Sequence, residues 1–137
     1  MFSGVYKVNN ARKVEDGVLA GRYPEDIYDG VVTSIGHPWF ICTHVIAEVL
    51  YLSYHHFSKL GEIRVTPINF PLFKRFIDVQ GTQTLFKGDI KYEKALKGLR
   101  RMADGYLRTA GEYVGKDGRM DEQIERNKGT QRGESTS

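Results

Sequence analysis

The pattern that most restricts the fold is a long amphipathic stripe in the second half of the chain. Between residues 89 and 114, apolar side chains recur every three or four positions, which is the spacing of one face of an α-helix. The members of this stripe are Tyr92, Ala95, Leu96, Leu99, Met102, Ala103, Tyr106, Leu107, Ala110, Tyr113 and Val114. Asp89 precedes the stripe and is a suitable N-cap. We therefore predict a helix here that buries its apolar face against other elements.

A second helix is predicted from Pro38 to about Leu60. Proline is favoured at the first helical position, and Gly61 can end the helix in a left-handed conformation. Apolar residues cover a wide arc of this segment, so we expect it to contact more than one neighbouring element. A shorter helix is predicted over 72–79, whereas no strand pair and no internal repeat is evident. The pattern therefore favours an all-α fold.

Composition is that of a globular protein with a polar C-terminus. Hydrophobic residues make up 40% and charged residues 27% of the 137 residues, and no apolar run reaches the ~20 residues that span a bilayer. We expect residues 1–126 to form one domain and no membrane association. Residues 127–137 contain no large apolar side chain, so we expect a disordered tail. The single cysteine, Cys42, excludes an intrachain disulfide.

The most distinctive chemistry lies in the turn-rich segment 21–40, which begins GRYPEDIYDG and ends GHPWF. Charged side chains here can bind hydroxyl groups, and the aromatic rings offer flat apolar faces, so the mixture suits a sugar. The alternative is structural: Arg22 pairs with Asp26 to brace a turn, and the aromatic rings only pack. The candidate sugar-contacting residues are Arg22, Tyr23, Asp26, Tyr28 and Trp39.

The order of these residues resembles a known family. GRYPED, a tyrosine two residues on, and a G-x-P-W-F helix start are similar to the glucoamylases, the family 15 glycoside hydrolases that release glucose from the non-reducing ends of starch and glycogen. GRMDEQ at 118–123 is similar to that family's G-x-M-x-E-Q segment. The resemblance runs from about Phe2 to about Gln131. It implies an incomplete (α/α)6 barrel, comprising the later helices of a six-hairpin toroid, and no cofactor.

The resemblance also assigns roles to individual residues. Most glycosidases use two carboxyl groups, which in inverting enzymes stand about 6.5–9.5 Å apart with a water between them. Glucoamylases are inverting, and Glu122 would be the general base that activates this water. Arg22 and Asp26 would hold the terminal glucosyl hydroxyls, while Tyr28 and Trp39 would line the subsites. The expected substrates are α-1,4-linked glucans or malto-oligosaccharides.

Two features qualify these roles. The family's general acid lies upstream of anything in this sequence, so we expect the chain alone to have little or no glucosidase activity. Asp121 adjoins Glu122, and the pKa of the base would rise if the two carboxylates approached each other. Without the resemblance, the segment 121–126 is an ordinary acidic helical turn.

Three other interpretations follow from the residues. His44, Glu48 and His55 share a helix face, but their spacing and a nearby lysine favour a solvated face over a metal site. A row of basic residues on the 89–114 helix is interrupted by acidic ones, which favours an ordinary exposed face over nucleic-acid binding. The members of this row are Lys94, Lys97, Arg101 and Arg108.

The third interpretation is a structural remnant without activity of its own. Half a barrel leaves apolar helix faces open to water, which predicts association with the missing part of the barrel or with a second copy. The family suggests a secreted or vacuolar protein, although the N-terminal MFSGVYKVNN lacks the pattern of a signal peptide.

Overall fold

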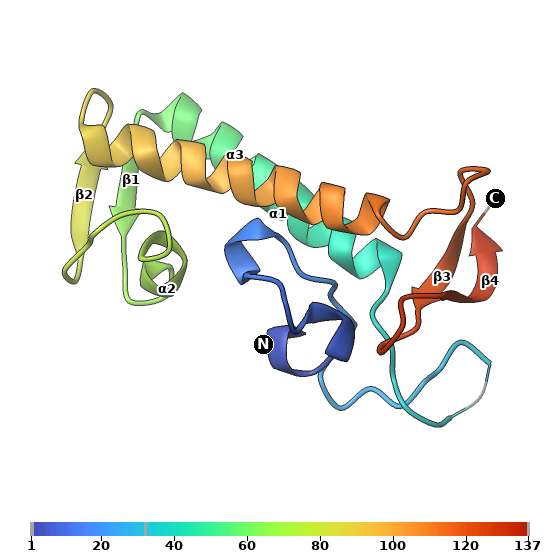
Figure 1. Cartoon of the computed structure of the whole chain (residues 1–137). Coiled ribbons are helices and arrows are strands. Elements are labelled where there is room, and N and C mark those ends of the chain that lie inside the picture. The colour runs from blue at the N-terminus through green and yellow to red at the C-terminus, as the bar shows by residue number, and fades with distance from the viewer. Residues whose placement is uncertain (1, 32, 137) are drawn as a thin grey trace.

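The computed structural model describes residues 2–31 and 33–136. Its two long helices, α1 (Phe40–Leu60) and α3 (Ile90–Gly111), lie side by side and run in opposite directions (Figure 1). Both predicted long helices are thereby confirmed to within a few residues. Gly61 ends α1 with a φ of 75°, as a left-handed C-terminal glycine does. The side chain of Asp89 accepts a hydrogen bond from the Phe86 N–H rather than capping α3.

The main core lies between the facing sides of these helices. Within α3, every member of the predicted stripe except Leu107 is buried. Gly105 lets the N-terminal segment approach this helix closely, because a Cβ at residue 105 would lie 2.5 Å from the carbonyl oxygen of Asp16. This packing offsets part of the ~1 kcal/mol that a glycine costs in a helix.

Two antiparallel strand pairs accompany the helices, although no strand pair was expected from the sequence. Antiparallel strands β1 (Glu62–Val65) and β2 (Gln83–Phe86) lie at one end of the helix pair, and β3 (Met120–Ile124) and β4 (Gln131–Thr136) lie at the other (Figure 1). These strands have four to six residues, and a run this short gives little periodic signal. In addition, no tight turn joins β1 to β2, so the sequence carries no hairpin signature.

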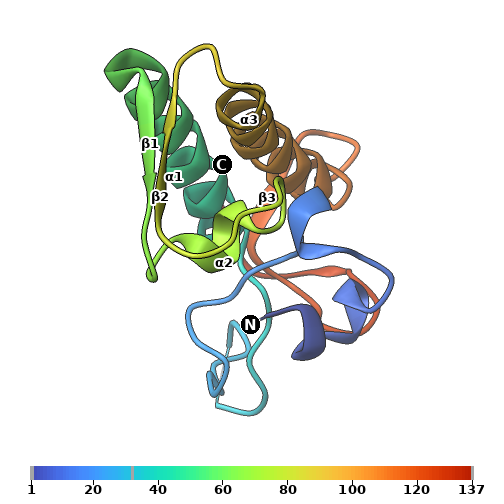
Figure 2. The ribbon, with the colours of Figure 1, turned by 90° about the vertical axis from the view of Figure 1, so that its left-hand side faces the viewer.

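The helix predicted over 72–79 is wrong in its extent. Helix α2 covers only Phe70–Phe73, and the chain then continues through turns that bury Ile77 and Val79. Figure 2 shows this end of the molecule, with β1 and β2 beside α1 and with α2 at their lower ends. Three short 3-10 turns precede α1, at Phe2–Gly4, Lys7–Asn9 and Val14–Asp16 (η3).

Residues 131–136, part of the segment that we expected to be disordered, form strand β4 and pair with β3. The segment around Glu122 is likewise a strand and not an acidic helical turn. Gln131 attaches the tail through its amide, which accepts a hydrogen bond from the Asp121 N–H at 2.7 Å and donates one to the Tyr113 carbonyl at 2.8 Å. The polar side chain of Gln131 makes these contacts, so residues 131–136 lack the apolar alternation from which a strand is predicted.

Candidate active site

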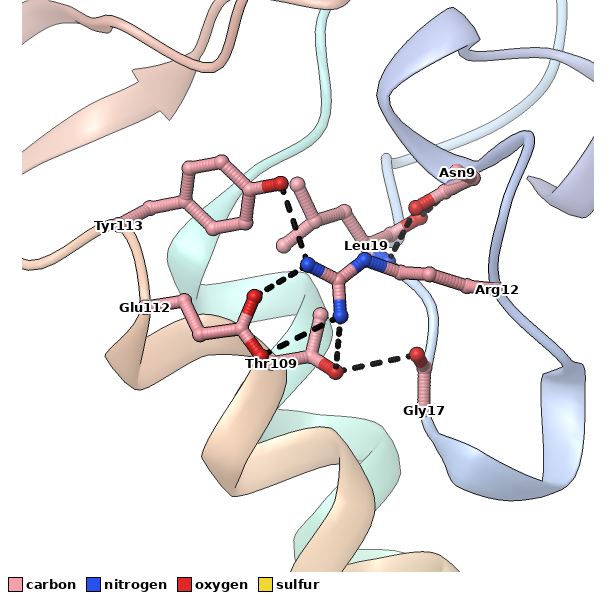
Figure 3. A network of polar contacts seen from close by, with 7 residues as sticks. All are labelled: Asn9, Arg12, Gly17, Leu19, Thr109, Glu112 and Tyr113. Carbon is pink, nitrogen blue, oxygen red and sulfur yellow. Dashed lines mark hydrogen bonds and ion pairs between the residues drawn. The ribbon is translucent and has the colours of Figure 1, made fainter.

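The segment that leads into the turn-rich loop is fixed to the end of α3. The guanidinium of Arg12 forms an ion pair with the Glu112 carboxylate and donates hydrogen bonds to the hydroxyls of Thr109 and Tyr113, each at 3.3 Å (Figure 3). Hydrogen bonding to the Glu112 carboxylate is the main cause of a raised pKa for Arg12. This network is made by residues about a hundred positions apart, so it ties the two ends of the chain together.

Two further contacts carry this anchoring to the start of the loop. The amide of buried Asn9 pairs with the backbone of Leu19, donating at 2.8 Å and accepting at 2.9 Å (Figure 3). The next residue, Ala20, donates from its N–H to the Thr43 hydroxyl at 3.0 Å and accepts from the Trp39 N–H at 2.8 Å. The loop therefore starts beside the first turn of α1.

Arg22 and Asp26 form a two-pronged ion pair inside the loop. Both guanidinium-to-carboxylate hydrogen bonds measure 2.7 Å, and the Asp26 side chain is only 1% exposed. The Tyr28 N–H also donates to the Asp26 carboxylate, at 3.1 Å. Hydrogen bonding to Arg22 is the main reason why the pKa of Asp26 is lowered. The bracing that the structural alternative predicted is present, and it holds one face of the guanidinium in place.

Three aromatic rings surround the same guanidinium. The Arg22 carbon Cζ lies 4.7 Å from the Trp39 ring centre, 5.3 Å from that of Tyr28 and 5.7 Å from that of Tyr23. The Tyr28 and Trp39 ring centres are 6.0 Å apart with an angle of 41° between the ring planes. Half of the Tyr23 surface and 38% of the Arg22 side chain remain exposed. The structure thus brings all the candidate sugar-contacting residues into one cluster.

The β3–β4 hairpin is joined to this cluster through the backbone. Trp39 forms an isolated antiparallel bridge with Gln123, and the Ile124 N–H donates to the Pro38 carbonyl at 2.9 Å. These bonds make the residues before α1 a partial third strand beside β3. The candidate base, Glu122, is therefore one residue away from the bridge that holds the indole-bearing residue.

Glu122 stands at a bulge in this hairpin. Asp121 pairs with Ser135 and Gln123 pairs with Arg132, so two residues of β4 lie opposite Glu122 alone. Bulges of this kind redirect a side chain and are frequent beside active sites. No pattern in the residues around Glu122 predicts this bulge.

Gly133 in the bulge makes room for the carboxylate. Its φ is 91°, and a Cβ at residue 133 would lie 2.9 Å from a Glu122 carboxylate oxygen and 3.7 Å from the Gly30 Cα. The Glu122 carboxylate and Gly30 of the turn-rich loop therefore both lie next to Gly133. A second tie between loop and hairpin is the ion pair of Asp29 with Arg132, at 3.9 Å.

The neighbouring carboxylate does not crowd the candidate base. Successive side chains of a strand point to opposite faces, so Asp121 and Glu122 diverge. Asp121 is buried and forms an ion pair with Arg119 at 3.3 Å. The alternation of side chains along β3 therefore does not favour an approach of the two carboxylates.

A layer of residues beneath the loop was missed by sequence reasoning. The guanidinium of Arg126 donates to the carbonyls of Gly36 (3.1 Å) and Val5 (2.6 Å) and lies 5.4 Å from the Tyr6 ring centre. Its backbone N–H donates to Nδ1 of His37 at 3.2 Å. Arg126 sits where the sequence turns polar, and no local pattern distinguishes it from a solvated arginine.

Burial disfavours the charged forms of two of these supporting groups. Burial is the main cause of the lowered pKa of His37, which is 2% exposed, and it raises the pKa of Tyr6 to about 12. Several buried polar atoms around this layer have no hydrogen-bond partner among the described residues. They are the Tyr6 hydroxyl, His37 Nε2, Trp39 Nε1 and both amide atoms of Gln123.

The other candidate sites receive no support from side-chain geometry. Within residues 2–31 and 33–136, no group of three His, Cys, Asp or Glu side chains is arranged to hold a metal ion. The helices in those same ranges include none that is long and apolar enough to cross a membrane. Cys42 is half-buried, and burial raises the pKa of its thiol.

Comparison with known proteins agrees with this architecture. The sequence matches the family described as Glycosyl hydrolases family 15 over residues 1–137. The chain therefore belongs to this family of glycoside hydrolases.

The individual relatives that match this chain are glucoamylases. The chain is 37% identical to a glucoamylase of Blastobotrys adeninivorans and 33% identical to glucoamylase-1 of Arthroderma benhamiae, covering 96% and 94% of this chain. It spans only 22% and 20% of those two relatives, or about a fifth of their length. A solved glucoamylase from Hypocrea jecorina is similar over 98% of this chain and 22% of its own, with 30% identity and a TM-score of 0.89.

Proposed function

We propose that this chain supplies part of the active site of a glucoamylase-type enzyme that hydrolyses α-1,4-linked glucans with inversion. The cluster of Arg22, Tyr23, Asp26, Tyr28 and Trp39 would bind the glucosyl unit at the non-reducing end of starch, glycogen or a malto-oligosaccharide. The relatives above are glucoamylases, which supports this substrate class. The cluster and Glu122 would lie in the loop and the strand pair that adjoin the later helices of an (α/α)6 barrel.

In this proposal the ion pair of Arg22 with Asp26 has two tasks. Asp26 uses its carboxylate to hold the guanidinium, and the exposed part of Arg22 remains free to donate to sugar hydroxyls. The rings of Tyr28 and Trp39, which flank the guanidinium, would contact the apolar C–H face of a glucose ring. A polar group framed by aromatic surface distinguishes a hydroxylated ring from a purely apolar ligand.

Glu122 would act as the general base. Its carboxylate would accept a proton from water while the water oxygen attacks the anomeric carbon and the glycosidic bond breaks. The single observation that carries this role is the bulge opposite Glu122, with Gly133 leaving space at the carboxylate. A base must be held in one direction, and the hairpin bonds on both sides of Glu122 provide that support.

The general acid would come from a part of the family fold outside these residues. Inverting hydrolysis requires a second carboxyl group to protonate the leaving oxygen. We therefore expect the chain alone to bind malto-oligosaccharides weakly and to release little or no glucose. Association with the remainder of the barrel would complete the site.

Sugar binding can be measured directly because Trp39 is the only tryptophan. Titration with maltoheptaose should change the tryptophan emission, and Arg22→Gln should abolish the change. Arg108→Gln is the matched control, because Arg108 is an exposed arginine of α3 outside the cluster. Equal binding by all three proteins would contradict the proposed sugar site.

The role of Glu122 needs a separate test. Glu122→Gln should retain the emission change with maltoheptaose, since the amide keeps the shape of the side chain but cannot accept a proton. Glucose release from soluble starch should be negligible for the unaltered chain and for the variant. Release by the unaltered chain that Glu122→Gln abolishes would support the base and refute the expected inactivity.

A further inference from the structure

A cleft of about 360 Å³ lies outside the candidate active site. It is bounded by η3, by the turns after α2 and by the first half of α3. Phe76 and Gly98 meet within it, since a Cβ at residue 98 would lie only 2.3 Å from Cγ of Phe76. The absence of a side chain at residue 98 therefore allows an aromatic ring to lie directly on the helix and to form part of the cleft wall.

The charges that line this cleft are unbalanced. Glu15 and Asp16 are its two carboxylates, and each already has an arginine partner. Arg75 binds Glu15 at 3.0 Å, and Arg101 binds Asp16 at 3.3 Å. Three lysines line the same cleft and have no ion-pair or hydrogen-bond partner for their ammonium groups among the described residues. They are Lys13, Lys94 and Lys97.

Three unpaired ammonium groups around one concavity repel one another, and an anion between them would remove that repulsion. A phosphate monoester suits them best, because it offers three terminal oxygens and a charge close to −2 at neutral pH. Lysine is an established point-charge partner for phosphate. The ring of Phe76 adds an apolar surface that inorganic phosphate would leave unused.

We propose that this cleft binds a small organic phosphate, meaning a sugar or nucleoside ring that carries a phosphate group. Lys13, Lys94 and Lys97 bind the phosphate, and Phe76 contacts the ring. The sequence pattern had presented Lys94 and Lys97 as part of an ordinary mixed helix face. In the folded chain these two lysines line the same cleft as Lys13, which comes from a distant segment. The positive charge is therefore concentrated in a cleft and does not form the extended row that would suit nucleic acid.

Calorimetric titration of the whole chain tests this site. Glucose 6-phosphate and AMP are the two ring phosphates, and the one that binds more tightly identifies the ring. Glucose and inorganic phosphate are the controls for the ring alone and the anion alone. We expect at least one ring phosphate to bind at least about tenfold more tightly than either control, because only a ring phosphate can contact both the lysines and the Phe76 ring.

Two double variants each remove two positive charges, the first variant inside the cleft and the second outside it. Lys94→Gln/Lys97→Gln should weaken ring-phosphate binding at least about tenfold. Lys59→Gln/Lys91→Gln removes two exposed lysines that do not line the cleft and should change binding less than about twofold. All four substituted lysines are exposed, so both variants should keep the circular-dichroism spectrum and melting temperature of the unaltered chain.

Four results of the calorimetric titrations would overturn the proposal. They are no binding of either ring phosphate, equal binding of glucose, equal binding of inorganic phosphate, and equal weakening in the two double variants. Trp39 emission should stay constant during these titrations, because Trp39 does not line this cleft. An emission change would place the phosphate at the glucan site and would also contradict the proposal. The outcome is independent of whether the chain binds glucans.

Discussion

The two ends of the α1–α3 helix pair use opposite means to hold their shape. The apolar end, residues 54–92, contributes side chains from α2 and both strands of the β1–β2 pair to the larger apolar cluster, which continues between the two long helices as far as Val18 and Tyr106. The site end, residues 2–12, 17–43 and 109–133, has a smaller apolar cluster around Leu19, Phe40 and Ile124. It relies instead on ion pairs and on side chains bonded to backbone.

The two ends also differ in where buried polar side chains lie. Within the described ranges, all buried polar and charged side chains lie at the site end, and so do the buried polar atoms that have no partner. An unsatisfied buried group costs about 1–3 kcal/mol. We infer that the apolar end supplies stability, which allows the site end to hold buried polar groups that a purely structural core would exclude.

The largest expected effect is at the apolar end. Phe73 is 1% exposed and packs edge-on against Phe57, with ring centres 5.9 Å apart. Phe73→Ala should lower the free energy of unfolding by about 3–5 kcal/mol, measured by urea unfolding. Ile68→Ala, at a residue that is 92% exposed, should change it by no more than about 0.5 kcal/mol. Similar losses for both variants would show that the cluster is not the source of stability.

The next effect tests whether the site end depends on paired charge. Arg22→Gln leaves the Asp26 carboxylate buried with a weaker partner. We expect a loss of about 2–3 kcal/mol, below that of a fully buried pair because the Arg22 side chain is 38% exposed. Arg108→Gln, which removes the same charge at an exposed residue, should cost no more than about 0.5 kcal/mol.

The pH dependence of this pair has a defined sign. The pKa of Asp26 is lowered in the folded state, so its stabilisation is fully present above the ordinary carboxyl pKa of 3.8. It is lost as the pH falls through the lower, folded-state pKa. The stability difference between Arg22→Gln and the unaltered chain should therefore shrink in acid. A constant difference between pH 7 and strongly acidic pH would contradict the assigned pairing.

Sequence patterns predicted the features that depend on spacing within one segment. The 3.6-residue period of the apolar stripe and the glycine after Leu60 gave both long helices. The mixture of charge and aromatic surface in 21–40 gave the members of the cluster. A short motif can specify a cluster of this kind because the cluster assembles within twenty residues of chain.

Features that depend on distant partners were not predictable. The bulge at Glu122 forms only when β4 pairs with β3. Strand β4 has no alternation of apolar residues from which it could have been predicted. Arg126 reaches Val5 and Gly36, which are about 120 and 90 positions away. Polar contacts over such separations leave no periodic trace in either segment, so only the folded backbone reveals them.

A smaller effect is expected from filling the space at the bulge. Gly133→Ala adds a Cβ that meets the Glu122 carboxylate at a residue whose φ is 91°. Gly118→Ala is the matched control, because Gly118 also has a positive φ of 82° but has open space around it. We expect losses of about 2 kcal/mol for Gly133→Ala and about 1 kcal/mol for the control in urea unfolding. Equal losses would show that the backbone alone requires a glycine at 133.

The smallest expected effect comes from buried His37. It tests whether protonation of this imidazole lowers the stability of the site end. Arg126 and Arg132 face this imidazole and disfavour its charge, whereas Glu125 and Asp29 favour it, and burial outweighs them all. Because the folded-state pKa is lowered, the stabilising contribution is present above the ordinary value of 6.5 and is lost as the pH falls through the folded-state pKa.

One proton contributes at most about 1.4 kcal/mol per pH unit, so the unaltered chain should lose no more than about that amount between pH 6.5 and 5.5 through His37. His37→Asn removes the titrating group and should flatten this part of the profile. His55→Asn, at an exposed histidine of α1, should leave it unchanged. If both variants keep the slope, the acid sensitivity arises elsewhere. If His37→Asn alone flattens it, the neutral imidazole beneath the loop is a specific weakness of the site end, because no buried titratable histidine lies within the apolar end.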